Sequence, residues 1–150
     1  MKSGRNLIVV LTAVAIPVAL VAAVPDIIQS RQQSYKRMGA SFKALNDEMR
    51  KAAPAISVVR AQATNLNTAA SSVTNAFPRG SGQESGIKTG AHPAIWQNTV
   101  GFRTAQGNLL AATSNLRAAA GSGDLGRVRG ALQRVGPTCK ACHDQYRIKD

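Results

Sequence analysis

Four segments of the chain repeat apolar residues at alternating steps of three and four, and no long stretch alternates apolar and polar residues with a period of two. The stripes run from Ile28 to Met49, from Ile56 to Phe77, from Phe102 to Ala119 and from Leu125 to Tyr146. This spacing is typical of amphipathic helices that pack along a buried seam. The sequence therefore predicts an all-α fold, an antiparallel four-helix bundle whose helices cross at about 20°.

Proline, aspartate and glycine mark the expected helix boundaries. The first helix is predicted to start at Pro25 or Asp26. The second is predicted to start near Pro54 and to stop before Pro78, and the third to start at Pro93 and to stop at Gly121. Proline is tolerated in a first helical turn and restricts the residue before it, and glycine commonly ends a helix. Residues 79–92 are rich in Gly and Ser without an apolar period, and they form the expected long connection.

The N-terminal segment has the layout of a secretory signal. Two cations precede an uncharged apolar run, residues 7–24, that ends in small residues. Small residues favour cleavage after Ala23, which makes residues 1–23 the signal peptide and leaves residues 24–150 as one bundle domain. The alternative is an uncleaved membrane anchor, since 18 apolar residues reach the lower limit for a hydrocarbon core of roughly 30 Å. The predicted location is the periplasm in either case.

The chain is markedly basic. It carries 19 Lys and Arg against 7 Asp and Glu, a net charge of +12, and removal of the signal leaves 17 basic residues and a net charge of +10. The cations are scattered along every segment, and with an export signal this excludes nucleic acid as the expected partner. Steering toward acidic redox partners or anionic membrane surfaces fits this balance.

Near the C-terminus, Cys139-Lys140-Ala141-Cys142-His143 forms the haem-attachment pattern C-x-x-C-H. Residues three apart on a helix project from one face, so the two thiols can bond the two vinyl groups of one porphyrin. We therefore expect one covalently attached haem c per chain, with His143 as an axial iron ligand. A thioredoxin-like dithiol and a structural disulfide are the alternatives, and neither requires the histidine. Aromatic residues make up only 4% of the chain, a deficit that a buried porphyrin would fill.

Two polar residues interrupt the first apolar stripe. Arg31 occupies a seam position, where a cation is costly unless a buried anion or a route to solvent accompanies it. We expect a haem propionate to be that anion; the alternative is a side chain that reaches solvent at the helix end. Tyr35 is expected to face the porphyrin opposite His143, or else to be an ordinary core aromatic. His92 lies in the Gly-rich connection and is not expected to bind the iron.

These residues resemble the cytochrome c′ family, the class II c-type cytochromes. The similarity rests on Cys139 to Arg147, Gly123-Asp124-Leu125, Pro93-Ala94-Ile95-Trp96, and Arg31-Gln32 with Phe42. The resemblance implies a bundle that is often dimeric through its first two helices, with high-spin, five-coordinate iron and a distal side blocked by Tyr35. It also implies that Arg147 lies near the proximal face, that Arg31 lies near the propionates and that Asp144 orients His143.

The resemblance further implies a function. A haem protein of this kind binds NO and CO reversibly and exchanges single electrons with redox partners, without turning over an organic substrate, so no enzymatic activity is expected. Low-spin relatives carry a methionine ligand on the first helix, and Met38, one turn from Tyr35, gives the alternative of a low-spin His/Met electron carrier. A third alternative is a thiol-disulfide oxidoreductase that uses Cys139 and Cys142.

Overall fold

A computed structural model describes residues 19–149. Residues 1–18 and 150 lie outside the described part of the chain, so the predicted signal peptide falls almost wholly outside it and stays a prediction. The described elements are α1 (Ala19–Met49), α2 (Ile56–Ser72), the 3-10 turn η1 (Gln83–Ser85), α3 (Ala94–Gln97), α4 (Thr99–Ser122) and α5 (Leu125–Tyr146). None of the described helices combines the length and apolar character that a membrane span requires. The predicted all-α fold is confirmed.

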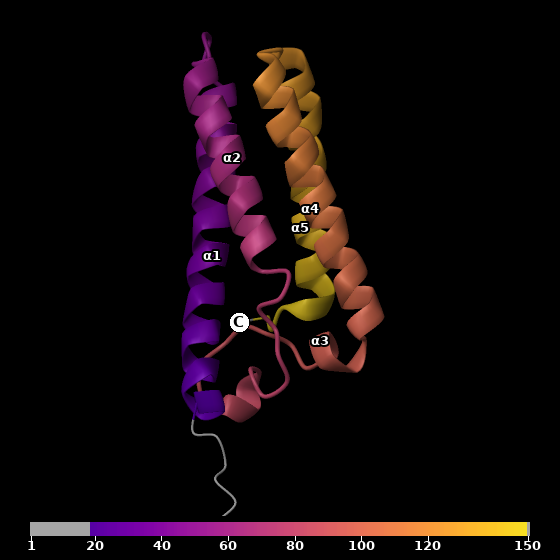
Figure 1. Ribbon diagram of the computed structural model, residues 1–150. Coiled ribbons are helices and arrows are strands. Elements are labelled where there is room, and N and C mark those ends of the chain that lie inside the picture. Colours follow the sequence, from indigo (N-terminus) through magenta and orange to yellow (C-terminus); the bar gives the residue numbers. More distant parts are fainter. Residues whose placement is uncertain (1–18, 150) are drawn as a thin grey trace, which may run out of the picture.

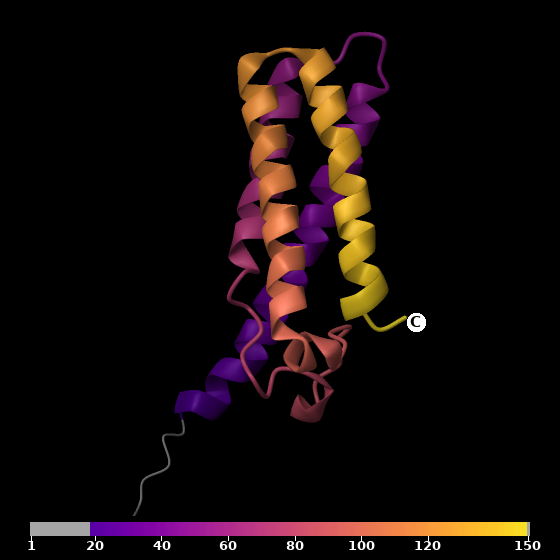
Figure 2. The same cartoon turned by 90° about the vertical axis from the view of Figure 1, so that its right-hand side faces the viewer.

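The four long helices form a bundle of two antiparallel pairs. α1 lies beside α2, α4 lies beside α5, and α2 packs against α4 (Figure 1). The short connections α1–α2 and α4–α5 lie at one end of the bundle. The long connection between α2 and α3 lies at the other end, together with α3 and the C-terminal turns of α5 (Figure 2). Segments that are far apart in sequence therefore meet at this second end.

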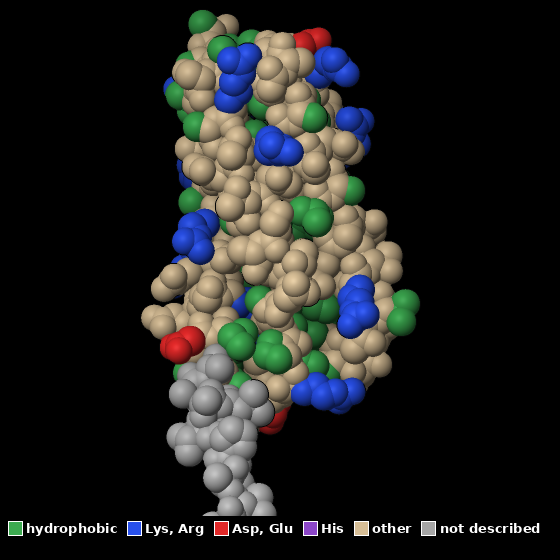
Figure 3. Space-filling view, in the orientation of Figure 1, with side chains coloured by type: hydrophobic (Ala, Val, Ile, Leu, Met, Phe, Trp, Pro, Cys, Tyr) green, Lys and Arg blue, Asp and Glu red, His purple; other side chains and the backbone are tan. Residues whose placement is uncertain are grey.

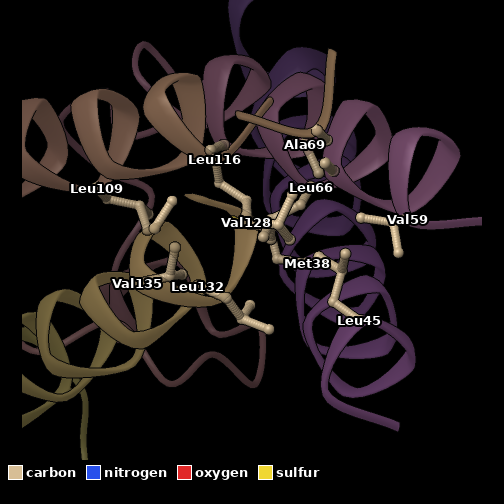
Figure 4. Packing of buried hydrophobic residues seen from close by; sticks show 14 of the residues in the cluster. Met38, Leu45, Val59, Leu66, Ala69, Leu109, Leu116, Val128, Leu132 and Val135 are labelled. Carbon is tan, nitrogen blue, oxygen red and sulfur yellow. The ribbon is translucent and has the colours of Figure 1, made fainter. Parts of the chain in front are cut away.

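The buried residues form two clusters. The larger cluster fills the bundle with leucine, valine and alanine from the four long helices. Figure 4 shows Leu66 of α2, Leu116 of α4 and Val128 of α5 pointing toward one another, and all three are at most 1% exposed. The smaller cluster contains Ile95 and Phe102 and lies at the end that carries α3. The two clusters meet at the C-terminal part of α5.

The predicted start of the first helix and the predicted end of the second were wrong by several residues, whereas the start of α2 at Ile56 agrees with the prediction near Pro54. α1 begins before Pro25, which lies inside the helix; a proline removes one backbone hydrogen bond, and the turns on both sides outweigh that loss. α2 ends at Ser72 instead of continuing to Phe77. The Ser72 and Thr74 hydroxyls donate to backbone carbonyls three residues back and compete with the helical pattern. Phe77 therefore leaves the helix.

Local capping sets the boundaries around α4. Asn98 separates α3 from α4, and its Oδ1 accepts a hydrogen bond from the Gly101 N–H at 3.0 Å. The predicted stop at Gly121 was two residues early: Gly123, with φ of 79°, is the left-handed residue that ends α4. Asp124 then caps α5 by accepting two hydrogen bonds from backbone N–H groups of the first turn, at 2.8 and 3.0 Å.

Candidate functional site

A cavity of about 590 Å³ lies at the end of the bundle that carries α3. Its walls come from α1, the α2–α3 connection, α4 and the last turns of α5. All the predicted site residues and the alternative ligand line it: Arg31, Tyr35, Met38, Cys139, Cys142, His143 and Arg147. The volume falls within the range of about 300–1,000 Å³ that ligand pockets occupy. The fold thus brings one face of α1 opposite the C-x-x-C-H motif of α5.

The aromatic residues of the chain are concentrated around this cavity. Five of the six line it: Tyr35, Phe42, Phe77, Phe102 and Tyr146. The Phe77 and Phe102 rings meet edge to face at 4.8 Å, and the Phe102 and Tyr146 rings do so at 5.1 Å. Such contacts hold flat side chains in defined orientations. The bundle interior beyond the cavity is closed by aliphatic side chains instead.

The two cysteines lie where the two buried clusters meet. Cys139 packs against the larger cluster and Cys142 against the smaller one, and both are half-buried. Burial raises the pKa of both thiols. A dithiol oxidoreductase needs the opposite, a lowered thiol pKa, which a helix N-terminus often provides. The motif occupies the C-terminal turns of α5, so the geometry disfavours thiol-disulfide chemistry.

The imidazole of His143 follows directly on the same helix and also lines the cavity. Partial burial lowers its pKa, and the positive charge of Arg147 lowers it further, while Asp144 raises it. The neutral imidazole is the form that binds a metal ion. Asp144 acts on His143 through its charge, because its hydrogen bond goes to Lys140 Nζ at 2.6 Å.

Two side chains of α1 face the motif. Tyr35 packs edge-on against Phe77 at 6.4 Å, and burial raises the pKa of its hydroxyl well above the ordinary value. The hydroxyl is therefore neutral at physiological pH. Met38, one turn later, is only 7% exposed and lines the same cavity. Tyr35 and Met38 therefore line the same cavity as the cysteine motif, and their roles toward the iron stay predictions.

Arg31 does not reach solvent, since only 3% of its surface is exposed, and the solvent alternative was wrong. Its terminal nitrogens donate to Ala76 O at 3.0 Å, Ser81 O at 2.8 Å, Ser81 Oγ at 3.1 Å and Thr89 Oγ1 at 3.0 Å. Its guanidinium also stacks over the Phe77 ring, 4.4 Å from the centroid. Arg31 therefore ties α1 to the α2–α3 connection, a role the sequence did not predict.

The segment after α5 completes the wall near His143. The N–H of His92 donates to Tyr146 O at 3.0 Å, and the N–H of Ile148 donates to Gly90 O at 3.0 Å. These two bonds hold residues 90–92 against the C-terminus. The His92 side chain is exposed and its Nδ1 accepts a hydrogen bond from the backbone two residues on, so it serves the local turn.

The residues of the cavity fit a haem. Two thiols three residues apart, an imidazole beside the second thiol, and aromatic and aliphatic walls of sufficient volume form the set that covalent haem attachment requires. Fold and site together define a c-type haem protein built on a four-helix bundle.

Comparison with known proteins gives the family. Residues 26–147 match the family described as Cytochrome C′, and the chain belongs to this family, whose members carry a covalently bound haem c. They are electron-carrying or gas-binding haem proteins rather than conventional enzymes, and are typically exported. Cytochrome c′ of Rubrivivax gelatinosus is 31% identical over 125 residues, which cover 83% of this chain and 95% of the relative.

Solved structures agree with the fold. A nitric oxide complex of a variant of cytochrome c prime from Alcaligenes xylosoxidans matches with a TM-score of 0.75 at 30% identity, over 85% of this chain and 97% of that chain. A carbon monoxide-bound variant from the same organism matches with a TM-score of 0.75 at 31% identity, over 84% of this chain and 97% of that chain.

Proposed function

We propose that this protein is a periplasmic haem protein that binds NO and CO reversibly at a high-spin, five-coordinate iron and transfers single electrons. The observation that carries the proposal is that Cys139, Cys142 and His143 of α5 line one cavity together with Tyr35 of α1. When bound there, haem supplies a redox-active iron with one coordination position available for a diatomic ligand. We do not expect the protein to turn over an organic substrate.

The site residues of the cavity have separate proposed roles in holding the haem. Cys139 and Cys142 would anchor the haem through thioether bonds, and His143 would be the iron ligand supplied by α5. Tyr35, from α1, would stand on the opposite side and exclude large ligands by the bulk of its ring. It would not supply a phenolate ligand, because burial raises the pKa of its hydroxyl. Small diatomic molecules pass such an obstacle at a cost in rate.

Two arginines complete the proposed site. Arg147 lies near the proximal face, where its charge lowers the pKa of His143 and so favours the metal-binding form. Arg31 places a buried positive charge in the cavity wall, which supports the proposal that it compensates a propionate. Its bonds to the α2–α3 connection would then orient the guanidinium for that contact.

A second candidate function is a low-spin electron carrier with Met38 as the sixth iron ligand. Met38 favours it because its side chain is buried in the cavity wall, one turn from Tyr35. In that case the iron would have no available position, and the protein would transfer electrons without binding gas.

The visible spectrum of the reduced, purified protein before and after CO addition separates these functions. A broad high-spin spectrum that shifts with CO supports the gas-binding function. A sharp low-spin spectrum that CO does not change supports the electron carrier. The Met38→Leu variant, similar in volume, is the control: it should gain CO binding only if Met38 is the ligand.

We also propose that the protein is exported and that its redox partners are acidic. The apolar run of residues 7–24 after two cations supports export, and the net charge of +10 that remains without residues 1–23 supports acidic redox partners. Figure 3 shows Lys and Arg spread along the whole length of one face, with few Asp and Glu.

Val58 on α2 is 39% exposed, which supports a homodimer through α1 and α2. Sedimentation of the unchanged protein and of Val58→Glu tests the dimer.

A further inference from the structure

A second cavity of about 450 Å³ lies against the haem cavity and shares part of its wall. The side chains of Phe77, Ile95 and Phe102 line both cavities. Ile95 and Phe102 are 3% and 5% exposed, so they are enclosed between the two spaces. A single layer of side chains therefore separates the second cavity from the haem cavity.

The second cavity opens to solvent on its other side. Asn75, Thr99, Arg103 and Gly107 line it and are exposed. In Figure 3, hydrophobic side chains gather at the end of the bundle that carries α3 and the α2–α3 connection. The outer rim of the second cavity is polar and its inner wall is apolar, so a small uncharged solute can pass from solvent to the aromatic wall without losing a charge-solvation term.

The dividing wall is held from both sides at Phe77. Its ring contacts Phe102 edge to face at 4.8 Å, and the Arg31 guanidinium lies over it from the haem cavity. On the outer side, Trp96 Nε1 donates to the Phe77 carbonyl at 3.2 Å. The backbone is thus fixed, while the half-buried ring borders both cavities.

We propose that diatomic gas enters and leaves the haem cavity through this second cavity, past Phe77, Ile95 and Phe102. The inference rests on the proposed function, that the haem iron binds such a gas. An entry route changes the activation barrier for gas to reach the iron, and it does not change the free energies of the gas-free and gas-bound protein. Obstructing it slows association and dissociation by the same factor and leaves the equilibrium constant unchanged.

Gly107 of α4 provides the test. It lines the second cavity but not the haem cavity, and a Cβ added there has no neighbour within 4 Å. Gly107→Phe therefore fits, and it replaces a poor helix former. We expect CO association and dissociation to slow by about tenfold each, which corresponds to about 1.4 kcal/mol of added barrier. The Kd for CO and the spectrum of the CO-free protein should stay unchanged, and the fraction of CO that recombines geminately after photolysis should rise.

Two further glycines serve as controls. Gly121→Phe lies on the same helix, is also without neighbours and lines neither cavity, so both rates should equal those of the unchanged protein. Gly39→Phe narrows the haem cavity from α1. Unchanged rates in Gly107→Phe, slowing in Gly39→Phe alone, or a changed Kd in Gly107→Phe would each overturn the route. If the unchanged protein binds no CO at all, the proposed function fails and the route fails with it; CO binding without a Gly107 effect overturns the route alone.

Discussion

Replacing Arg31 with glutamine should unfold the α2–α3 connection more readily than any surface substitution on α1. The change removes a charged donor from Ala76 O and Ser81 O and ends the stacking on Phe77. A hydrogen bond to a charged group contributes about 1.5–3 kcal/mol net, and a cation over an aromatic ring about 0.5–2 kcal/mol. Relief from burying the guanidinium and the bonds that glutamine retains offset part of this sum. The expected net loss is about 2–4 kcal/mol of unfolding free energy.

Urea denaturation of the haem-loaded protein, followed by far-ultraviolet circular dichroism, measures this loss. Arg37→Gln is the matched control on the same helix, because Arg37 is exposed and makes one bond, to Ser34 Oγ at 3.2 Å. The control should change the unfolding free energy by less than about 0.5 kcal/mol. If Arg31→Gln also stays within that limit, the reasoning that Arg31 anchors the connection is refuted.

Arg31→Lys separates anchoring from charge compensation. Lysine keeps the positive charge but lacks the planar fork of donors that contacts several oxygens at once. We expect it to lose most of the stability that Arg31→Gln loses, while the haem reduction potential stays near that of the unchanged protein. Arg31→Gln should shift the potential if the guanidinium compensates a propionate. A potential unchanged in both variants would leave anchoring as the sole role of Arg31.

Three other substitutions test separate features. Tyr35→Ala should speed CO association with the reduced protein, measured by flash photolysis, and an unchanged rate would remove Tyr35 from the distal role. Gly101→Ala should lower the unfolding free energy by about 1–3 kcal/mol, since its Cβ would come within 2.6 Å of the buried Tyr146 hydroxyl, while Gly107→Ala, in open space, should not. Glu48→Gln should make the unfolding free energy fall less steeply as the pH is lowered. A hydrogen bond from Lys51, and then one from the backbone, hold the pKa of Glu48 below its ordinary value of 4.5, so its contribution is complete above pH 4.5 and is lost as the pH falls through the folded-state pKa. A Glu48→Gln stability profile that falls as steeply as that of the unchanged protein would contradict this.

The four helices and the haem motif could be predicted because their signals are local. Seam spacing from Leu125 to Tyr146 fixes which face of α5 is buried, and Cys139, Cys142 and His143 lie within five residues of one another. The buried face of α5 follows the predicted stripe, with Val128, Leu132 and Val135 buried. On α4 the large residues Phe102, Leu109 and Leu116 are buried as predicted, but Thr113 and Ala120 are buried in place of Ala112 and Ala119.

The contacts that hold the cavity wall together could not be predicted, because they join residues that are far apart in the sequence. Arg31 binds carbonyl oxygens 45 and 50 residues away, and a carbonyl has no side-chain signature in the sequence. The bond from the Ile148 N–H to Gly90 O is of the same kind. The end of α2 at Ser72 escaped prediction for another reason: hydroxyl groups compete with the helix there, and the apolar stripe continues regardless.

The position of the two cysteines has a mechanical consequence. Cys139 belongs to the packing of the long bundle, whereas Cys142 packs with the small cluster formed by α3, α4 and the C-terminus. Because both cysteines lie on α5, three residues apart, a macrocycle bonded to both sulfurs would be fixed covalently to this one helix and would fill the junction of the two clusters. Unlike a disulfide, a thioether bond survives reducing conditions. The haem would therefore be held permanently by α5, while its contacts with α1 and the α2–α3 connection would be packing contacts that depend on the fold of the whole cavity end.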